Sequence, residues 1–142
     1  MAGSKLRRNG VARRNLAWGF TALAAMGLLA WWLAPGTRLS TVEVEVPELS
    51  PVAQAGQEAF QKHCAECHGA AGGGTDNGPP LVHKWYHPGH HADAAFVLAA
   101  KRGVPQHHWT FGSMPPQPQV GDRSLQQIIA YVRELQKANG IY

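Results

Sequence analysis

Cysteine is scarce in this chain of 142 residues, which contains only Cys64 and Cys67. Two cysteines provide no disulfide framework, and they are too few for a zinc site built from thiolates alone. A tetrahedral zinc site that combines both cysteines with two histidines stays open. A thioredoxin-like redox pair would need its C-x-x-C motif at the end of a strand in a βαβ unit, and the sequence predicts no such unit.

An excess of positive charge is missing from most of the chain. Five of the thirteen Lys and Arg residues precede residue 16. From Pro35 onward, eight positive and nine negative residues leave a net charge of −1. The high isoelectric point therefore reflects the N-terminal tail, and we expect no nucleic-acid partner for the rest of the chain.

Residues 16–34 lack charge altogether and form an uninterrupted apolar run of nineteen residues. As a helix this run would be about 28 Å long, close to the thickness of the hydrocarbon core of a bilayer. Trp18, Trp31 and Trp32 lie near its two ends, where indoles favour the membrane interface. Because residues 1–15 are basic, the positive-inside rule predicts a cytoplasmic N-terminus and a single-pass transmembrane signal anchor.

A cleaved signal peptide is the alternative for this run, but it would be shorter and followed by a cleavage site of small residues. The run instead ends in Trp-Trp-Leu-Ala-Pro-Gly. Residues 35–51, which contain three prolines, are predicted to form an extended linker. The alternating Val and Glu residues at 42–46 leave a short strand as a second interpretation.

The sequence Cys64-Ala65-Glu66-Cys67-His68 is the attachment signature of a c-type haem. In such a site the two thiols form thioethers with the vinyl groups of the porphyrin. The spacing suits two vinyl positions, and the next residue, a histidine, then falls under the iron. The motif therefore predicts one covalent haem c on Cys64 and Cys67, with His68 as the proximal ligand.

Residues 52–142 are predicted to form one small all-α domain with three helices and long loops. The apolar pattern places these helices at about residues 52–65, 93–102 and 123–138. Asp93 is the expected N-cap of the second helix, and Asp122 or Ser124 that of the third. Gly103 and Pro105 are expected to end the second helix.

With these motifs in place, residues 52–142 resemble the class I c-type cytochromes, specifically the small bacterial membrane-anchored type with one haem. In that family the first and last helices cross at close range through a glycine, an aromatic residue and an aliphatic–aromatic pair. Gly56, Phe60, Ile128 and Tyr131 match those positions. The resemblance implies a structural role for all four, because a glycine permits an approach of two backbones that a Cβ atom would block.

The resemblance also implies two further residues of the haem site. The family's second iron ligand is a methionine late in the chain, commonly followed by proline, and Met114-Pro115 matches this pattern. Met114 would then be the distal axial ligand, although a methionine can also fill a gap in a core. The family's Gly-Pro loop matches Gly78-Pro79, which implies that the carbonyl of Pro79 accepts the Nδ1 proton of His68.

Six histidines between this loop and Met114 depart from the family pattern: His83, His87, His90, His91, His107 and His108. Three interpretations remain open. The imidazoles could bind haem propionates or backbone, form a second copper or zinc site, or displace Met114 from the iron. For a metal, His83, His87 and one of His90 or His91 form the most economical set. The pairs His90-His91 and His107-His108 flank a helix about 15 Å long and need not meet unless the loop after Gly103 folds back.

The function that these features predict is single-electron transfer at the outer face of a bacterial inner membrane, in the periplasm. An iron with both axial positions filled by His68 and Met114 has no position for substrate. Membrane redox complexes or other electron-transfer proteins are the expected partners. Two alternatives remain: a haem-containing protein that handles or assembles copper through the histidines, and a small haem redox enzyme with a labile distal ligand.

Overall fold

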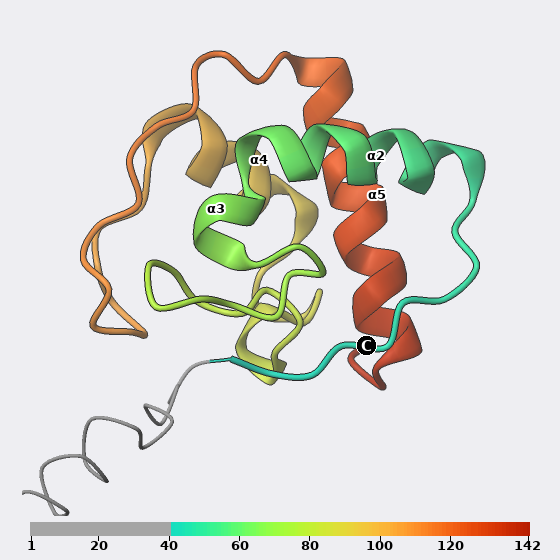
Figure 1. Ribbon diagram of the computed structural model, residues 1–142. Coiled ribbons are helices and arrows are strands. Elements are labelled where there is room, and N and C mark those ends of the chain that lie inside the picture. The colour runs from blue at the N-terminus through green and yellow to red at the C-terminus, as the bar shows by residue number, and fades with distance from the viewer. Residues whose placement is uncertain (1–40) are drawn as a thin grey trace, which may run out of the picture. The chain divides into compact units, whose positions relative to one another are not determined.

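The computed structural model describes residues 41–142, in which four helices and one 3-10 turn are joined by long loops (Figure 1). The described residues form no β-strand apart from two isolated backbone bridges, so the predicted all-α class is confirmed. No helix among them is long and apolar enough to cross a bilayer. The predicted tail at 1–15 and anchor at 16–34 lie outside the described residues.

The first described helix, α2 (Pro51–His63), begins at a capping serine followed by a proline, whose ring fixes φ near the helical value. Pro51 is its first residue, and the hydroxyl of Ser50 accepts a hydrogen bond from the backbone N–H of Ala53. The Ser50 hydroxyl also donates to Glu134 of the last helix over 2.6 Å. The start of α2 is therefore tied to a helix more than eighty residues further along the chain.

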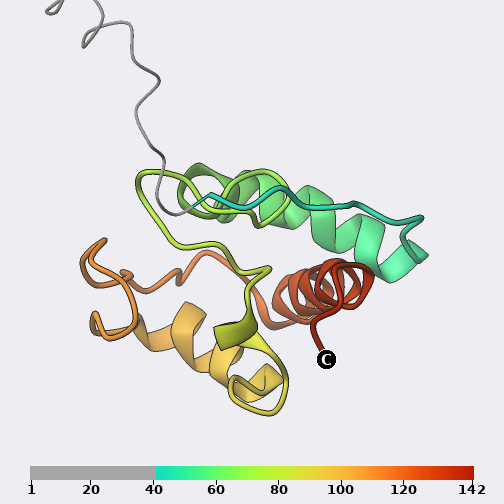
Figure 2. The same ribbon diagram turned by 90° about the horizontal axis from the view of Figure 1, so that it is seen from below.

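Two helices cross at the centre of the domain, α2 and α5 (Asp122–Ala138), as both views show (Figures 1 and 2). A Cβ atom on Gly56 would collide with the backbone carbonyl of Gln127, so only glycine permits this crossing. Phe60 and Tyr131 are fully buried beside it, with ring centroids 5.4 Å apart in an edge-to-face arrangement. The predicted crossing through Gly56, Phe60, Ile128 and Tyr131 is confirmed.

The remaining elements are α3 (Ala65–His68), the 3-10 turn η1 (Lys84–Tyr86) and α4 (Asp93–Arg102). The first predicted helix, placed at 52–65, is in fact interrupted: α2 ends at His63, and Cys64 has non-helical backbone angles before α3 begins. The prediction for 93–102 is confirmed.

Both predicted aspartate caps were wrong. Ala92 and Gly121 are the N-caps of α4 and α5, and neither makes a side-chain cap bond. Asp93 is instead the first helical residue of α4, where its carboxylate pairs with Arg133 of α5 over 2.8 Å. Asp122 likewise opens α5 and pairs with Lys101 over 2.7 Å. Each carboxylate thus links the two helices rather than capping its own.

Residues 41–50 are extended and lie along the domain (Figure 1). The backbone N–H of Val42 donates to the carbonyl of Gly73, and the Asn139 amide makes hydrogen bonds to both backbone groups of Glu45. Val44 and Leu49 pack against the core. The strand interpretation of residues 42–46 was therefore wrong, and the described part of the predicted linker is bound to the domain.

Candidate functional site

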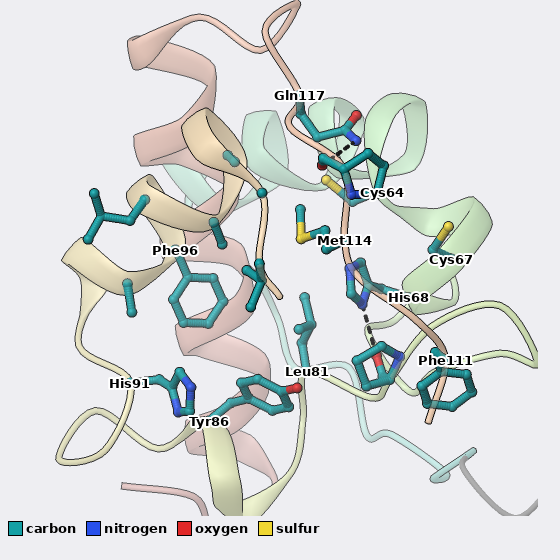
Figure 3. Close-up of a pocket in the computed structure, with 18 of the residues that line it drawn as sticks. Cys64, Cys67, His68, Leu81, Tyr86, His91, Phe96, Phe111, Met114 and Gln117 are labelled. Carbon is teal, nitrogen blue, oxygen red and sulfur yellow. Dashed lines mark hydrogen bonds between the residues drawn. The ribbon is translucent and has the colours of Figure 1, made fainter. Parts of the chain in front are cut away.

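A cavity of about 450 Å³ lies between α3, α4 and the loop that precedes α5. Apolar side chains from several elements form much of its wall: Phe60, Leu81, Phe96, Val104, Leu125 and Ile128. Four residues that the sequence analysis singled out line the same cavity: Cys64, Cys67, His68 and Met114 (Figure 3). The fold thus gathers two thiols, an imidazole and a thioether around one apolar space.

The break between α2 and α3 positions the two cysteines and the histidine. Cys64 occupies the break, and its carbonyl accepts backbone hydrogen bonds from Cys67 and His68 over 3.2 and 2.9 Å. Cys67 is exposed at the cavity edge, whereas His68 is buried. Cys64 and the α3 turn that follows it therefore place three side chains from a five-residue stretch at one wall of the cavity.

Burial keeps the Cys64 thiol in its uncharged form. Desolvation, with a smaller effect from Cys67, raises its pKa from 9.0 to about 11. Among the described residues, the side chains whose metal-ligand atoms converge include neither cysteine, so the structure gives no support to the mixed cysteine–histidine zinc site that the sequence left open. The C-x-x-C motif also follows a helix rather than a strand, which removes support for the thioredoxin-like interpretation.

His68 is oriented by the loop that follows it. Its Nδ1 lies 2.9 Å from the carbonyl oxygen of Pro79, and since a carbonyl can only accept, the Nδ1–H donates. A Cβ atom on Gly78 would lie 2.8 Å from the carbonyl oxygen of Cys67, so glycine allows the loop to pack against the motif. Burial lowers the pKa of His68 despite an opposing effect of the Pro79 hydrogen bond. The Nε2 lone pair of a neutral imidazole is thus free to bind a metal.

Met114 reaches the cavity from the loop before α5, where the backbone fixes its position. Met114 and Val104 exchange two backbone hydrogen bonds, each 2.9 Å long. The backbone N–H of Gln117 donates to the carbonyl of Ala100 over 2.6 Å. These bonds attach the methionine loop to the end of α4, and Figure 3 shows the Met114 side chain in the same cavity as His68.

Gly103 makes this attachment possible, although the sequence indicated only that it ends α4. Its φ angle is +74°, and a Cβ atom there would lie 2.5 Å from the carbonyl oxygen of Met114. The only sequence signal for this contact is weak: a glycine directly after one predicted helix, and Pro115 and Pro116 before the next. The contact itself is made largely by backbone atoms, which side-chain patterns do not specify.

Replacing Gly103 with alanine is expected to lower the free energy of unfolding by about 2–4 kcal/mol, from the left-handed backbone and the collision together. Gly112→Ala is the matched control, because its φ angle is +91° but nothing lies within 4 Å of a Cβ atom there. That variant should lose only about 1–2 kcal/mol, the conformational part. Equal losses in denaturant titrations of the two variants would contradict a close contact between Gly103 and Met114.

The six midchain histidines separate into two groups in the structure. His83 packs edge-on against Trp85 and Trp109, and His87 accepts a hydrogen bond from the backbone N–H of Gly89. The other four imidazoles gather where the loop after α4 folds back toward the segment before it: His90, His91, His107 and His108. Partial desolvation lowers the pKa of His91, and desolvation and the neighbouring imidazoles lower that of His108.

This arrangement differs from the set proposed on sequence spacing. The residues whose ligand atoms converge within 4.8 Å are His90, His91 and His108. His83 and His87 do not belong to this group. The two histidine pairs meet because the condition stated for it is fulfilled: the Val104–Met114 pairing folds the loop after Gly103 back toward the segment before α4.

Comparison with known families decides between the remaining interpretations of the cavity. The family model described as "Cytochrome c" matches residues 53–136, which include the whole C-x-x-C-H motif and Met114. The chain belongs to the cytochrome c family. It is therefore a haem-based electron carrier, as the sequence predicted in outline. No curated protein matches the chain, and no solved structure does either.

The residues of this cytochrome c domain fit a haem c. The cavity wall is largely apolar, as the porphyrin body requires, and both thiols needed for attachment are free. The buried His68 presents a neutral imidazole whose orientation the Pro79 carbonyl fixes. Thiols, an oriented imidazole and an apolar space together meet the chemical demands of the group.

Proposed function

We propose that this cytochrome c is a single-electron carrier with His68 and Met114 as axial ligands, tethered to a bacterial inner membrane and facing the periplasm. The observation that carries the ligand assignment is the convergence of His68 and Met114 on one apolar cavity from separate segments. Met114 is the only methionine among the described residues, so no other thioether is present there.

Each residue of the site has a defined task. Cys64 and Cys67 would hold the haem covalently, and His68, oriented by Pro79, would bind its iron. Met114, held by its backbone pairing with Val104, would be the second protein ligand. When bound, the haem iron supplies the chemistry by cycling between its ferric and ferrous states. The largely apolar wall would limit contact between the bound group and water.

The tether is supported by the charge pattern of the N-terminal region. Residues 16–34 contain no charge, and five positive residues precede them. Confinement at a membrane raises the effective concentration of the domain near other membrane proteins. Membrane redox complexes or other electron-transfer proteins are accordingly the partners that we propose.

Replacing Met114 with alanine tests the ligand assignment. Thioether sulfur favours ferrous iron, so the variant should retain its covalent haem while its reduction potential falls by on the order of 100 mV. The weak sulfur-to-iron absorption band of the ferric protein should disappear. Redox titration and absorption spectroscopy of the purified holoprotein measure both quantities.

Met114→Leu is the companion variant, because it preserves the side-chain volume but removes the sulfur. Its sulfur-to-iron band should disappear, and its reduction potential should fall by a similar amount to that of the alanine variant. An unchanged potential and an unchanged spectrum in both variants would show that another residue occupies the distal position.

A further inference from the structure

A three-histidine cluster lies at the rim of the haem cavity, formed by His90, His91 and His108. Each residue can offer one ring nitrogen such that the three atoms lie within 4.8 Å of one another. His91 and His108 also line the cavity, whereas His90 is exposed. The cluster is thus open to solvent on one side and adjacent to the haem site on the other.

The loop that brings His108 to the cluster is closed by hydrogen bonds at several levels. The Val104–Met114 backbone pairing forms its base. Above the base, the backbone N–H of Gln106 donates to the Ser113 hydroxyl over 3.2 Å, and that of Gly112 donates to the Gln106 side chain over 2.7 Å. The approach of His108 to His90 and His91 is therefore built into the fold.

Aromatic contacts hold the cluster on its other side. The His108 ring stacks on Trp85, with centroids 4.9 Å apart and an interplanar angle of 27°. Trp109, the next residue, donates its indole N–H to the Tyr86 hydroxyl over 3.1 Å and packs against Trp85. The loop and the segment around η1 therefore form one packed unit, which fixes the plane of the His108 ring.

His91 has the hydrogen bonding of a metal-ligating histidine. Its Nδ1 donates to the carbonyl of Trp85 over 2.6 Å, which leaves the Nε2 lone pair of the neutral ring free. Its own backbone carbonyl accepts a hydrogen bond from Arg133 of α5. A ring tied through one nitrogen to a carbonyl presents the other nitrogen in a fixed direction, as ligands of metals commonly do.

We propose that His90, His91 and His108 bind one divalent transition-metal ion of the Zn²⁺ or Cu²⁺ class. Three neutral imidazoles suit such ions and do not suit the hard cations Mg²⁺ and Ca²⁺, which prefer oxygen ligands. The one carboxylate on the adjacent turn of α4, Asp93, is paired with Arg133 and is not part of the cluster. Three histidines leave a fourth position of a tetrahedral ion for water or a further ligand.

Titration calorimetry of the haem-loaded protein with Zn²⁺ alone tests the site. One ion should bind per chain, and Mg²⁺ at the same concentration should produce no binding heat. His108→Ala should weaken Zn²⁺ binding by at least about tenfold. His90→Ala should do the same, and because His90 is exposed this variant should fold even if the His108 variant does not.

His87→Ala is the matched control, since this residue lies in the same segment but outside the cluster. Its affinity for Zn²⁺ should equal that of the unmodified protein. Absence of Zn²⁺ binding would overturn the proposal, and so would loss of binding in His87→Ala with retention in His90→Ala. The haem spectrum, recorded throughout, reports separately on the axial ligands, so a change at the haem is distinguishable from failure of this site.

Discussion

Replacing His68 with alanine is expected to abolish accumulation of haem-loaded protein. The substitution removes the proximal imidazole, leaves the Pro79 carbonyl without its 2.9 Å partner, and opens a void in a buried wall. A buried acceptor without a partner costs about 1–3 kcal/mol in addition to the lost metal bond. Covalent haem staining of electrophoresed protein, together with the absorption spectrum, measures the remaining holoprotein.

His63→Ala is the matched control for this experiment. His63 is the last residue of α2 and also lines the cavity, but it is not part of the C-x-x-C-H motif. Its variant should accumulate holoprotein with an unchanged spectrum. Normal amounts of His68→Ala holoprotein, with the spectrum of the unmodified protein, would show that His68 is not the proximal ligand.

Replacing Gly56 with alanine is expected to lower the free energy of unfolding by about 3 kcal/mol or more, the upper end of the usual cost of overpacking. The sign is informative, because alanine at an ordinary position inside a helix stabilises it by roughly 0.5–1 kcal/mol relative to glycine. Here the new Cβ atom would collide with the backbone of Gln127, so α2 and α5 must move apart. Denaturant unfolding of the holoprotein measures the change.

Gly121→Ala provides the comparison for the second experiment. This glycine precedes α5, has a φ angle of −68°, and has nothing within 4 Å of a Cβ atom. Its loss as an N-cap should cost no more than about 1 kcal/mol. If Gly56→Ala proved as stable as Gly121→Ala, this result would contradict the close contact between the backbones of α2 and α5 at Gly56.

The helices were predictable because side-chain patterns specify them, whereas their crossing was implied by the family resemblance. The apolar stripe of α5 and the positions of Gly56 and Phe60 in α2 are periodic features of the sequence. The His68–Pro79 hydrogen bond followed from the family resemblance, and it is present in the structure. Local patterns with a defined period, and motifs with fixed spacing, thus carried most of the fold.

The remaining features depend on backbone contacts between distant segments, which leave little trace in side-chain patterns. The break at Cys64 interrupts a helix that the periodicity alone extends to residue 65. The pairing of Val104 with Met114 is made by main-chain atoms, so the fold-back that brings His108 to His90 could not be predicted from spacing. The length of the helix at 93–102 indicates how far apart its two ends lie, but it does not indicate where the loop after Gly103 runs.

The crossing of α2 and α5 also determines when the domain can form. The helix before Cys64 packs against one that begins at Asp122, so synthesis of α2 and the motif alone cannot bury Phe60 or close the cavity. Contacts between segments so distant in sequence form late, after the cost of closing the intervening loop has been met. The segment that carries Cys64 and Cys67 is consequently without its packing partner until α5 is available. Because Cys67 is exposed even in the folded domain, folding restricts access to Cys64 more than access to Cys67.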